Sequence, residues 1–354
     1  MEKIRFGIIG AGMIGPFHAE AICGLDDAEL IGVATTREQT AKPFAGKFGV
    51  RAWYTDYHQL LQRQDIDVVN ICTPPFLHEE MTVAAAKTGK HVLVEKPIAI
   101  NLKQADRMIA ACKKEKVKLG VIFQCRFHKN IQRIKEFIDN YEFGRLILGD
   151  AYVKWFRSQE YYDSGAWRGT WDKEGGGALI NQAIHTIDLL QWFMCEVDSL
   201  YACIDTVAHQ IEVEDIAVAV LKFKNGAMGV IEGSTALYPG LPRRLDLHGE
   251  RGSVILEGDD IKLWDFVDSK REKRIGPEDY SHKKLGDASS DPTHFSSENH
   301  KLQIKDFIEA IKKDKEPLVN GIEGRKSLEI VRAIYKSGKA SKPIKFPVSD
   351  WRMA

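Results

Sequence analysis

The apolar residues in the first third of the chain fall in short runs that predict buried parallel strands. These runs lie at residues 4–9, 30–34, 68–72, 91–94 and 119–123. Between the last two, residues 101–114 carry apolar side chains at helical spacing, so strands and helices alternate. Runs without polar alternation are typical of strands covered on both faces, and the pattern predicts an α/β domain with a parallel sheet.

The first run leads directly into Gly10-Ala11-Gly12-Met13-Ile14-Gly15, the G-x-G-x-x-G pattern of a dinucleotide-binding turn. Gly10 permits the tight turn, Gly12 lets the main chain approach a pyrophosphate, and Gly15 lets the next helix pack close to the strand. Met13 and Ile14 lie in the same turn, beside a helix N-terminus that favours phosphate. A purely structural glycine turn is the alternative. Because strand, turn and helix occur in the required order, we predict a Rossmann fold.

From Arg145 onward the strands become longer and their polar and apolar residues alternate. Two hairpins are predicted, at residues 215–232 and 245–257. In the first, Asn225 and Gly226 would supply the positive φ that a type I′ turn needs. These features predict an α+β domain with a large open, mostly antiparallel sheet. Helices on one face would leave the other face for a second copy, so we expect a homodimer or homotetramer formed through this sheet.

The remaining C-terminal pattern contains loops and two helices. Residues 265–299 are polar and predict loops with at most short strands. Helices are predicted at residues 297–313 and 327–337, the second ended by Gly338. We therefore divide the chain into a Rossmann dinucleotide-binding domain, residues 1–123, and a substrate-binding and oligomerisation domain, residues 124–354.

Charge and composition narrow the classes of partner. The chain has 354 residues, and 50 Lys and Arg residues balance 50 Asp and Glu residues. Nucleic-acid-binding proteins normally show a basic excess and membrane-surface proteins a basic amphipathic helix, so neither partner is expected. No leader precedes the first strand and no apolar run reaches about 18 residues, so we expect a cytoplasmic protein with a small-molecule substrate. The six cysteines include no C-x-x-C pair and are expected to be buried thiols, with no metal site.

The residues after the second strand bear on the choice of cofactor. An NAD site usually carries an acid there that binds the ribose 2′-hydroxyl, whereas this chain has Thr36 and Arg37. A hydroxyl and a guanidinium suit a 2′-phosphate, so NADP is favoured over NAD. The alternative is an NAD enzyme in which Arg37 is a solvated loop charge. Thr73 and Pro74 end the third run and are predicted to lie against the nicotinamide ribose, with His78 opening the next helix as a supporting residue.

The fourth run ends in Glu95-Lys96-Pro97. Pro97 disfavours the helical conformation at the residue before it, so Lys96 is held extended where the strand ends. The Lys96-Pro97 bond could be cis or trans, and the sequence does not decide between them. A lysine at a strand end is by default a solvated surface residue. A catalytic role for Lys96 therefore needs support from the rest of the chain.

The chain resembles a known family almost from end to end: the NAD(P)-dependent oxidoreductases that include glucose-fructose oxidoreductase, inositol dehydrogenase and rhizopine-catabolism proteins (Gfo/Idh/MocA). The motifs that carry the resemblance are Gly10-Ala11-Gly12-Met13-Ile14-Gly15, Cys72-Thr73-Pro74-Pro75, Glu95-Lys96-Pro97 and Gly175-Gly176-Gly177 followed by His185. The resemblance implies that Lys96 bonds both the nicotinamide ribose and the substrate hydroxyl, with Glu95 beside it in the cofactor site. It implies that His185 is the acid/base residue.

The glycine-rich segment leads into a predicted helix on which Asn181, His185 and Asp188 stand at i, i+4 and i+7, on one face. Burying three polar groups without partners is unfavourable, so this face is predicted to bind substrate. In the family's inositol dehydrogenases the residue four before the histidine is commonly Asp. Asn181 can orient a substrate but cannot take up a proton, so the chain looks more like branches that act on other sugars or nucleotide-linked sugars.

An aromatic-rich segment before these glycines contains Trp167 and Arg168. Ring faces beside hydrogen-bonding groups can bind a pyranose or a cyclitol, although core packing explains most such aromatic residues. Trp167-Arg168 resembles a family motif near the substrate. The resemblance also places Arg126 near the active site, and an interdomain salt bridge is the alternative for that residue.

Together these observations predict an NAD(P)-dependent oxidoreductase acting on CH-OH groups. Hydride would pass between the nicotinamide and a secondary alcohol or ketone of a sugar, cyclitol or sugar derivative. Lys96 would polarise the reacting oxygen, and His185 would remove or supply its proton. Two alternatives remain open at this point: a non-catalytic NAD(P)-binding regulator, and a glycosidase that oxidises its substrate transiently with tightly held NAD.

Overall fold

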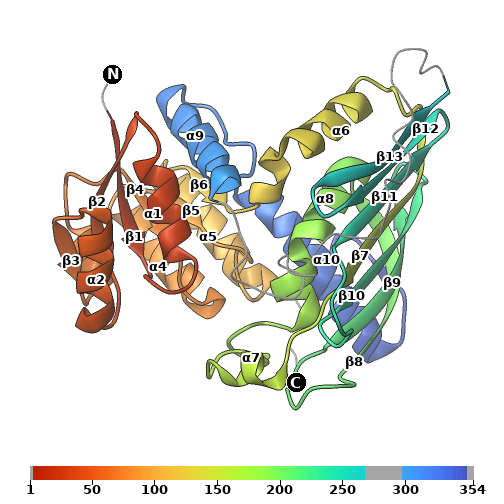
Figure 1. Cartoon of the computed structure of the whole chain (residues 1–354), viewed down its shortest axis with the longest axis horizontal. Coiled ribbons are helices and arrows are strands. Elements are labelled where there is room, and N and C mark those ends of the chain that lie inside the picture. Colours follow the sequence, from red (N-terminus) through yellow and green to blue (C-terminus); the bar gives the residue numbers. More distant parts are fainter. Residues whose placement is uncertain (1–2, 268–296, 349–354) are drawn as a thin grey trace. The chain divides into compact units, whose positions relative to one another are not determined.

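The computed structural model describes residues 3–267 and 297–348 (Figure 1). The chain forms two compact units, the first from Met1–Gln124 with Ser296–Arg325 and the second from Cys125–Phe295 with Lys326–Ala354. Each unit has its own sheet. None of the helices in the described part of the chain is both long enough and apolar enough to span a membrane.

The first unit is built on a parallel sheet of six strands in the order β3-β2-β1-β4-β5-β6. The strands are β1 (Ile4–Ile9), β2 (Ala28–Ala34), β3 (Ala52–Tyr54), β4 (Val68–Ile71), β5 (His91–Val94) and β6 (Leu119–Val121). The connecting helices are α1 (Gly15–Cys23), α2 (Glu38–Phe48), α3 (Tyr57–Leu61), η1 (Pro75–Leu77), α4 (His78–Lys87) and α5 (Leu102–Lys114). This strand order is that of doubly wound dinucleotide-binding domains, so the predicted Rossmann fold is confirmed.

A helix from late in the sequence completes the first unit. Ile304 and Phe307 of α9 (Glu298–Lys312) belong to the same hydrophobic core as Phe6 of β1. The amide of Gln303 accepts a hydrogen bond from the main-chain N–H of Phe123 (3.1 Å) and donates one to the carbonyl of Val121 (2.7 Å). These bonds satisfy main-chain groups at the edge strand β6. The predicted division into residues 1–123 and 124–354 assigns α9 to the second domain instead. The contacts that place α9 in the first unit join residues distant in sequence, which local patterns do not reveal.

The second unit contains a sheet of eight strands in the order β13-β12-β11-β7-β10-β9-β8-β14. The strands are β7 (Leu146–Lys154), β8 (Val197–Asp205), β9 (Ile216–Phe223), β10 (Met228–Ser234), β11 (Arg244–Gly249), β12 (Gly252–Glu257), β13 (Asp260–Phe266) and β14 (Ile344–Lys345). Only the β7–β10 pair among these is parallel. The predicted mostly antiparallel sheet is therefore confirmed.

Helices of the second unit cover one face of this sheet (Figure 1). The helical segments are η2 (Gln124–Phe127), α6 (Lys129–Asp139), α7 (Gln159–Asp163), η3 (Ala178–Ala183), α8 (Ile184–Met194) and α10 (Gly321–Ala340). A Cβ on Gly149 of β7 would lie 2.6 Å from Met194 Sδ of α8, and a Cβ on Gly338 of α10 would lie 2.7 Å from Ile204 of β8. Glycine at these two positions therefore lets the helices approach the sheet closely.

Four local predictions were wrong. The six cysteines were expected to be buried, but Cys23, Cys195 and Cys203 are exposed. Gly338 does not end the last helix, because α10 continues to Ala340 and uses this glycine for packing. The first hairpin has no type I′ turn: of its two central residues only Gly226 has a positive φ (+88°). The main-chain N–H of Phe223 instead donates to the carbonyl of Ala227, and the N–H of Gly226 donates to the carbonyl of Phe223. These bonds close a three-residue loop, which needs only one residue in the left-handed conformation. The helix predicted after the glycines is divided into the π-helical η3 and the α-helical α8.

Candidate functional site

The glycine turn between β1 and α1 has the shape that a pyrophosphate requires. Gly10 has φ +103°, and a Cβ there would lie 2.5 Å from the carbonyl of Cys72. A Cβ on Gly15 would lie 2.6 Å from the carbonyl of Gly10, whereas no described atom lies within 4 Å of a Cβ placed on Gly12. The first and third glycines therefore serve close packing, and the second leaves room above the main chain.

The start of α1 is suited to an anion. The helix begins at Gly15, after Met13 and Ile14, and its first turn holds no acidic residue. No side chain of the described residues caps this end. The positive end of the helix dipole is thus available to phosphate, although Pro16 has no N–H and the N–H of Phe17 bonds the carbonyl of Ile14. The residues of the turn fit the dinucleotide that the sequence predicts.

The residues that follow β2 lie at the surface. Thr36 and Arg37 are exposed, and Arg37 occupies the N-cap position of α2. Glu38, which comes next, pairs with Lys42 one helical turn later. The carboxyl end of β2 therefore presents a hydroxyl and a guanidinium where the ribose of a bound dinucleotide is expected.

Lys96 follows the end of β5, and its peptide bond to Pro97 is cis. The lysine is half-buried. Glu95 is buried instead of facing a ligand: its Oε1 lies 2.8 Å from His18 Nε2, and its Oε2 accepts a hydrogen bond from the main-chain N–H of Lys96 (3.1 Å). Burial would raise the pKa of Glu95, but the imidazoles of His18 and His300 beside it hold that pKa well below its usual range. The carboxylate thus holds the main chain of Lys96 from within the core, and its contact with a cofactor stays a prediction.

The turn after β4 is held by His78. Its Nδ1 lies 2.9 Å from the carbonyl of Pro97, and its Nε2 lies 2.9 Å from the carbonyl of Thr73. Burial lowers the pKa of this imidazole, although the two carbonyl groups favour its protonated form. His78 is fully buried, so it supports the Thr73-Pro74 turn and does not reach a ligand directly.

In the second unit, Asn181 and His185 belong to different helical segments. Asn181 lies in η3, whose π-helical hydrogen bonds span five residues, and His185 lies in the first turn of α8. Both are half-buried. The amide of Asn181 donates a hydrogen bond to the buried carboxylate of Glu174. A carboxylate thus lies next to Asn181, although the sequence position itself lacks one.

Glu214 anchors the N-terminus of η3. Its carboxylate accepts hydrogen bonds from the main-chain N–H groups of Gly177 and Leu179 (both 2.9 Å) and from the hydroxyl of Tyr335 (2.9 Å). Burial raises the pKa of Glu214 to about 7, against three donors that lower it. This side chain therefore determines how the helical segment that carries Asn181 begins.

Arg126 and Asp188 form a buried ion pair. The guanidinium Nε and Nη2 each lie 2.7 Å from one carboxylate oxygen, and both residues are at most 1% exposed. Ser327 of α10 donates a third hydrogen bond to Asp188 (2.8 Å). Both residues lie in the second unit, so this salt bridge is not interdomain, and the contact of either residue with a substrate stays a prediction. We assign the pair a structural role, because each charge is already satisfied within the core.

Arg168 lines a cavity of about 570 Å³ in the second unit, a volume suited to a small molecule. Its guanidinium stacks on Trp167 (4.5 Å to the ring centroid) and on Tyr161 (4.2 Å), and donates to the Tyr161 hydroxyl (2.5 Å). His209 and Thr206 also line this cavity, whereas Asn181 and His185 are not among its lining residues. Arg168 is thus available to a ligand and is oriented by aromatic rings.

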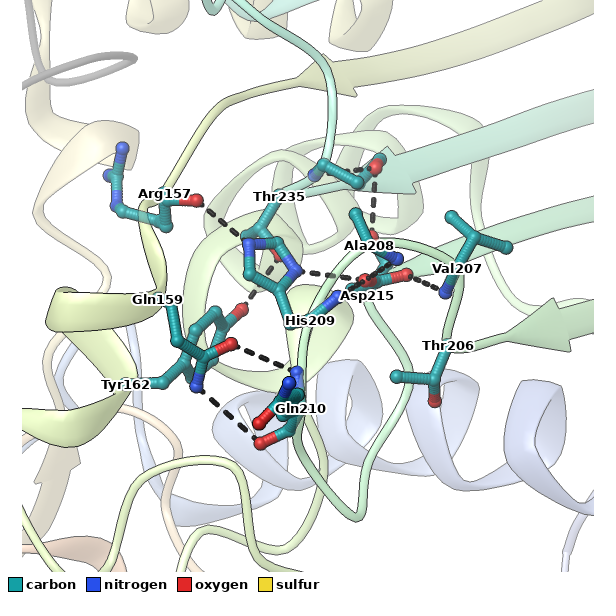
Figure 2. Close-up of polar contacts among 12 residues, drawn as sticks. Arg157, Gln159, Tyr162, Thr206, Val207, Ala208, His209, Gln210, Asp215 and Thr235 are labelled. Atoms are coloured by element: carbon teal, nitrogen blue, oxygen red, sulfur yellow. Dashed lines mark hydrogen bonds and ion pairs between the residues drawn. The ribbon is translucent and has the colours of Figure 1, made fainter.

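The wall of this cavity depends on a buried carboxylate that sequence reasoning missed (Figure 2). Asp215 accepts hydrogen bonds from the main-chain N–H groups of Val207, Ala208 and His209 and from His209 Nδ1 (2.8–3.0 Å). His209 Nε2 lies 2.8 Å from the carbonyl of Arg157. The loop 206–209 is therefore folded around one carboxylate.

Sequence reasoning also missed His18, His300, Glu174 and Glu214. Three of them had a local signal: His18 follows the glycine turn by one helical turn, Glu174 directly precedes the glycines, and Glu214 is an acid beside an apolar strand. His300 had none, because it lies in a polar segment far from Glu95.

Comparison with known proteins gives matches over almost the whole chain. The model of an oxidoreductase family with an NAD-binding Rossmann fold matches residues 4–123, and the Gfo/Idh/MocA C-terminal domain matches residues 131–255. Myo-inositol 2-dehydrogenase of Thermotoga maritima is 31% identical over 351 residues, which cover 97% of this chain and 98% of the relative. D-glucoside 3-dehydrogenase of Escherichia coli is 32% identical over 196 residues, 54% of each chain.

A solved structure is similarly close. The WlbA dehydrogenase from Bordetella pertussis, in complex with NADH and UDP-GlcNAcA, has 33% sequence identity and a TM-score of 0.85. The similarity covers 98% of this chain and 100% of that chain.

Proposed function

Since this chain belongs to the Gfo/Idh/MocA family of oxidoreductases with an NAD-binding Rossmann fold, we propose that it oxidises or reduces a polyhydroxylated small molecule. Hydride passes between the nicotinamide and a secondary alcohol or ketone of a sugar, cyclitol or sugar derivative. The observation that carries the proposal is the end-to-end match to dehydrogenases, combined with a glycine turn that is open above Gly12.

We propose Lys96 and His185 as the two catalytic residues. Lys96 hydrogen-bonds the reacting oxygen and stabilises the charge that develops on it during hydride transfer. His185 takes the hydroxyl proton on oxidation and returns it on reduction. General acid–base catalysis of this kind contributes about 10²- to 10⁴-fold to turnover. Both residues are half-buried, which leaves part of each side chain accessible to a ligand.

The test compares turnover of Lys96→Ala and His185→Ala with that of the parent protein, once a substrate is found by screening cyclitols, glucosides and nucleotide-linked sugars. Each variant is expected to lose about 10²- to 10⁴-fold in kcat. Lys87→Ala and His58→Ala are matched controls, because both residues are exposed and lie outside the proposed site. Near-normal kcat in both Lys96→Ala and His185→Ala would show that the assignment is wrong.

The substrate class follows from polar groups of the second unit. Arg168 is oriented at a cavity of about 570 Å³, and Asn181 is oriented by Glu174. Relatives support a sugar-like ligand: one is named for myo-inositol, and the structure of another holds UDP-GlcNAcA. We propose that Trp167 contributes indirectly, by holding the guanidinium of Arg168. An Asn in place of a carboxylate favours sugars or nucleotide-linked sugars over free inositol.

We propose NADP as the preferred cofactor. Thr36 and Arg37 are exposed after β2, where a 2′-phosphate would need a cation and a hydroxyl donor. The complex of the Bordetella relative contains NADH, so the cofactor proposed here differs from the one bound in that complex. Parallel titrations with NADPH and NADH measure it, and tighter binding of NADH would refute it.

We propose that a second copy of the chain covers the open face of the eight-stranded sheet. The helices lie on the other face, and four side chains that point outward from β8, β9 and β10 are apolar and exposed. They are Tyr201, Val218, Val220 and Met228. Tyr201 is the register partner of Val220, so the apolar positions adjoin one another across strands. A face of this composition is suited to a self-complementary interface.

A further inference from the structure

The carboxylate of Glu95 is approached by two imidazoles inside the first unit. Its Oε1 lies 2.8 Å from His18 Nε2 and 3.8 Å from His300 Nε2, and the two rings pack edge to face with centroids 5.3 Å apart. His18 comes from α1, Glu95 from the end of β5 and His300 from α9. All three residues are buried. Helix α1, the segment that leads from β5 to Lys96, and helix α9 therefore meet at the carboxylate of Glu95.

The hydrogen bonds of this cluster fit one protonation state. Burial lowers the pKa of His18, which favours a neutral ring with a single N–H. His18 Nδ1 lies 2.9 Å from the amide nitrogen of Asn70 on β4 and accepts from it. The proton of the ring is therefore on Nε2, where it is donated to Glu95. A neutral imidazole and an ionised carboxylate complete this chain of bonds from β4 to β5.

The same carboxylate holds the main chain of Lys96. Glu95 Oε2 accepts from the N–H of Lys96 at 3.1 Å, while the N–H of Glu95 bonds the carbonyl of Ile71 on β4. On the other side of the lysine, the carbonyl of Pro97 is held by His78. Glu95 thus holds the main-chain N–H of Lys96, and His78 holds the carbonyl of the residue that follows it.

The three side chains His18, Glu95 and His300 resemble a metal-ligand set, since their ligand atoms all lie within 4.8 Å of one another. The spacing favours hydrogen bonding instead. Ligands 2.0–2.1 Å from a tetrahedral zinc ion lie about 3.3 Å apart, which is more than the 2.8 Å between His18 and Glu95. That distance is the ordinary length of a hydrogen bond to a charged group.

His300 gives an independent reason to assign the cluster a function. Among residues 3–267 and 297–348, no hydrogen-bond partner lies at either of its ring nitrogens, although the residue is 1% exposed. A buried imidazole without such partners is unfavourable for folding. Its Nε2 lies 3.8 Å from Glu95 Oε1, and the two imidazoles beside this carboxyl group hold its pKa below the usual range. The buried imidazole of His300, which is unfavourable for folding, therefore lies beside the carboxylate that it helps to keep ionised.

We propose that His18, Glu95, His300 and His78 form a positioning network that fixes the main chain of Lys96 and so directs its ammonium group. The inference rests on the proposed function of Lys96. The network links the dinucleotide turn to the catalytic lysine, because His18 lies one turn into the helix that begins at Gly15. None of the four side chains touches the substrate.

A double-mutant cycle tests the network. His18→Leu removes the bond to Glu95 and is expected to lower kcat about 10- to 100-fold, the effect of a small misplacement of a catalytic group. His18→Gln keeps an N–H donor at nearly the same position and is expected to restore most of that loss. In a Lys96→Ala background, His18→Leu should lower the residual kcat less than about twofold, because the network acts only through the lysine.

Two further measurements separate positioning from general damage. The Kd for the reduced cofactor, measured by fluorescence titration, should change less than about threefold in His18→Leu, while kcat falls. The pH profile of kcat should move in His18→Leu and return in His18→Gln. If His18→Leu does not fold, His300→Phe replaces it: an aromatic ring is kept and the imidazole beside Glu95 is lost, with an expected fall in kcat of about tenfold.

The outcomes distinguish this inference from the proposed function. Equal losses from His18→Leu with and without Lys96, or an unchanged pH profile in every network variant, would refute the network alone. Near-normal kcat in Lys96→Ala would refute the role of the lysine and the network with it. Stoichiometric zinc that is lost in His300→Phe would show that the cluster is a metal site instead.

Discussion

The buried carboxyl group of Glu214 makes the stability of the second unit depend on pH. The residue is 2% exposed, and its three donors come from Gly177, Leu179 and Tyr335. Burial raises its pKa from 4.5 to about 7. Glu214→Gln keeps the size of the side chain and removes its titration.

The sign of the effect follows from linkage. The native pKa of Glu214 lies above the unfolded value, so the unfolded state loses its proton first as the pH rises. The contribution of this group to stability is complete below the unfolded pKa and is lost as the pH rises through the native pKa. With values of 4.5 and about 7, the parent protein should lose about 2.5 kcal/mol between about pH 5 and about pH 8 through Glu214 alone.

Urea denaturation of the parent and of Glu214→Gln at these two pH values measures the effect. The variant turns an amide N–H₂ toward a main-chain donor, which destabilises it by about 1–3 kcal/mol at both pH values. The unfolding free energy of the parent minus that of the variant should therefore be about 2.5 kcal/mol smaller at pH 8 than at pH 5. Glu142→Gln, at an exposed site in the same unit, is the control. An equal parent–variant difference at both pH values would refute the reasoning.

Three other substitutions test separate features. Arg126→Ala leaves Asp188 charged and buried, so urea denaturation should show a loss of about 3–5 kcal/mol, and a loss below about 1 kcal/mol would contradict the buried ion pair. Arg37→Ala should raise the Kd for NADPH about 10- to 100-fold and leave that for NADH within about twofold, because only the 2′-phosphate needs the guanidinium. Equal changes for the two cofactors would argue against this role. Val220→Lys places a charge on the open sheet face, 54% exposed in the isolated chain, and light scattering should then report a monomer. An unchanged oligomer would mean that the interface lies elsewhere.

Local sequence patterns were sufficient for the framework of the first unit. The five apolar runs became β1, β2, β4, β5 and β6, and Gly10 in the glycine turn has a positive φ. These features depend on residues that are neighbours in sequence, because strand burial and turn geometry are set over a few positions. The lysine motif was found in the same way, as the exit of a strand.

The candidate site was less predictable where groups distant in sequence decide the role of a residue. The spacing of Asn181, His185 and Asp188 suggested one polar face, but Asp188 is neutralised by Arg126, 62 residues earlier. The same spacing assumed an uninterrupted α-helix, whereas Glu214 anchors a π-helical segment first. Periodicity carries no information about such partners.

The sequence by itself determined the fold class of both units, the dinucleotide turn and the strand exit that carries Lys96, because each is encoded within a short segment. Only the tertiary structure decided how Lys96 is held. Glu95 and His300 are separated by more than half of the chain, and they meet because α9 packs its apolar face on the core of the first unit. In the buried interior the electrostatic interactions between the carboxylate and the two imidazoles are stronger than they would be in water. These groups therefore orient one another.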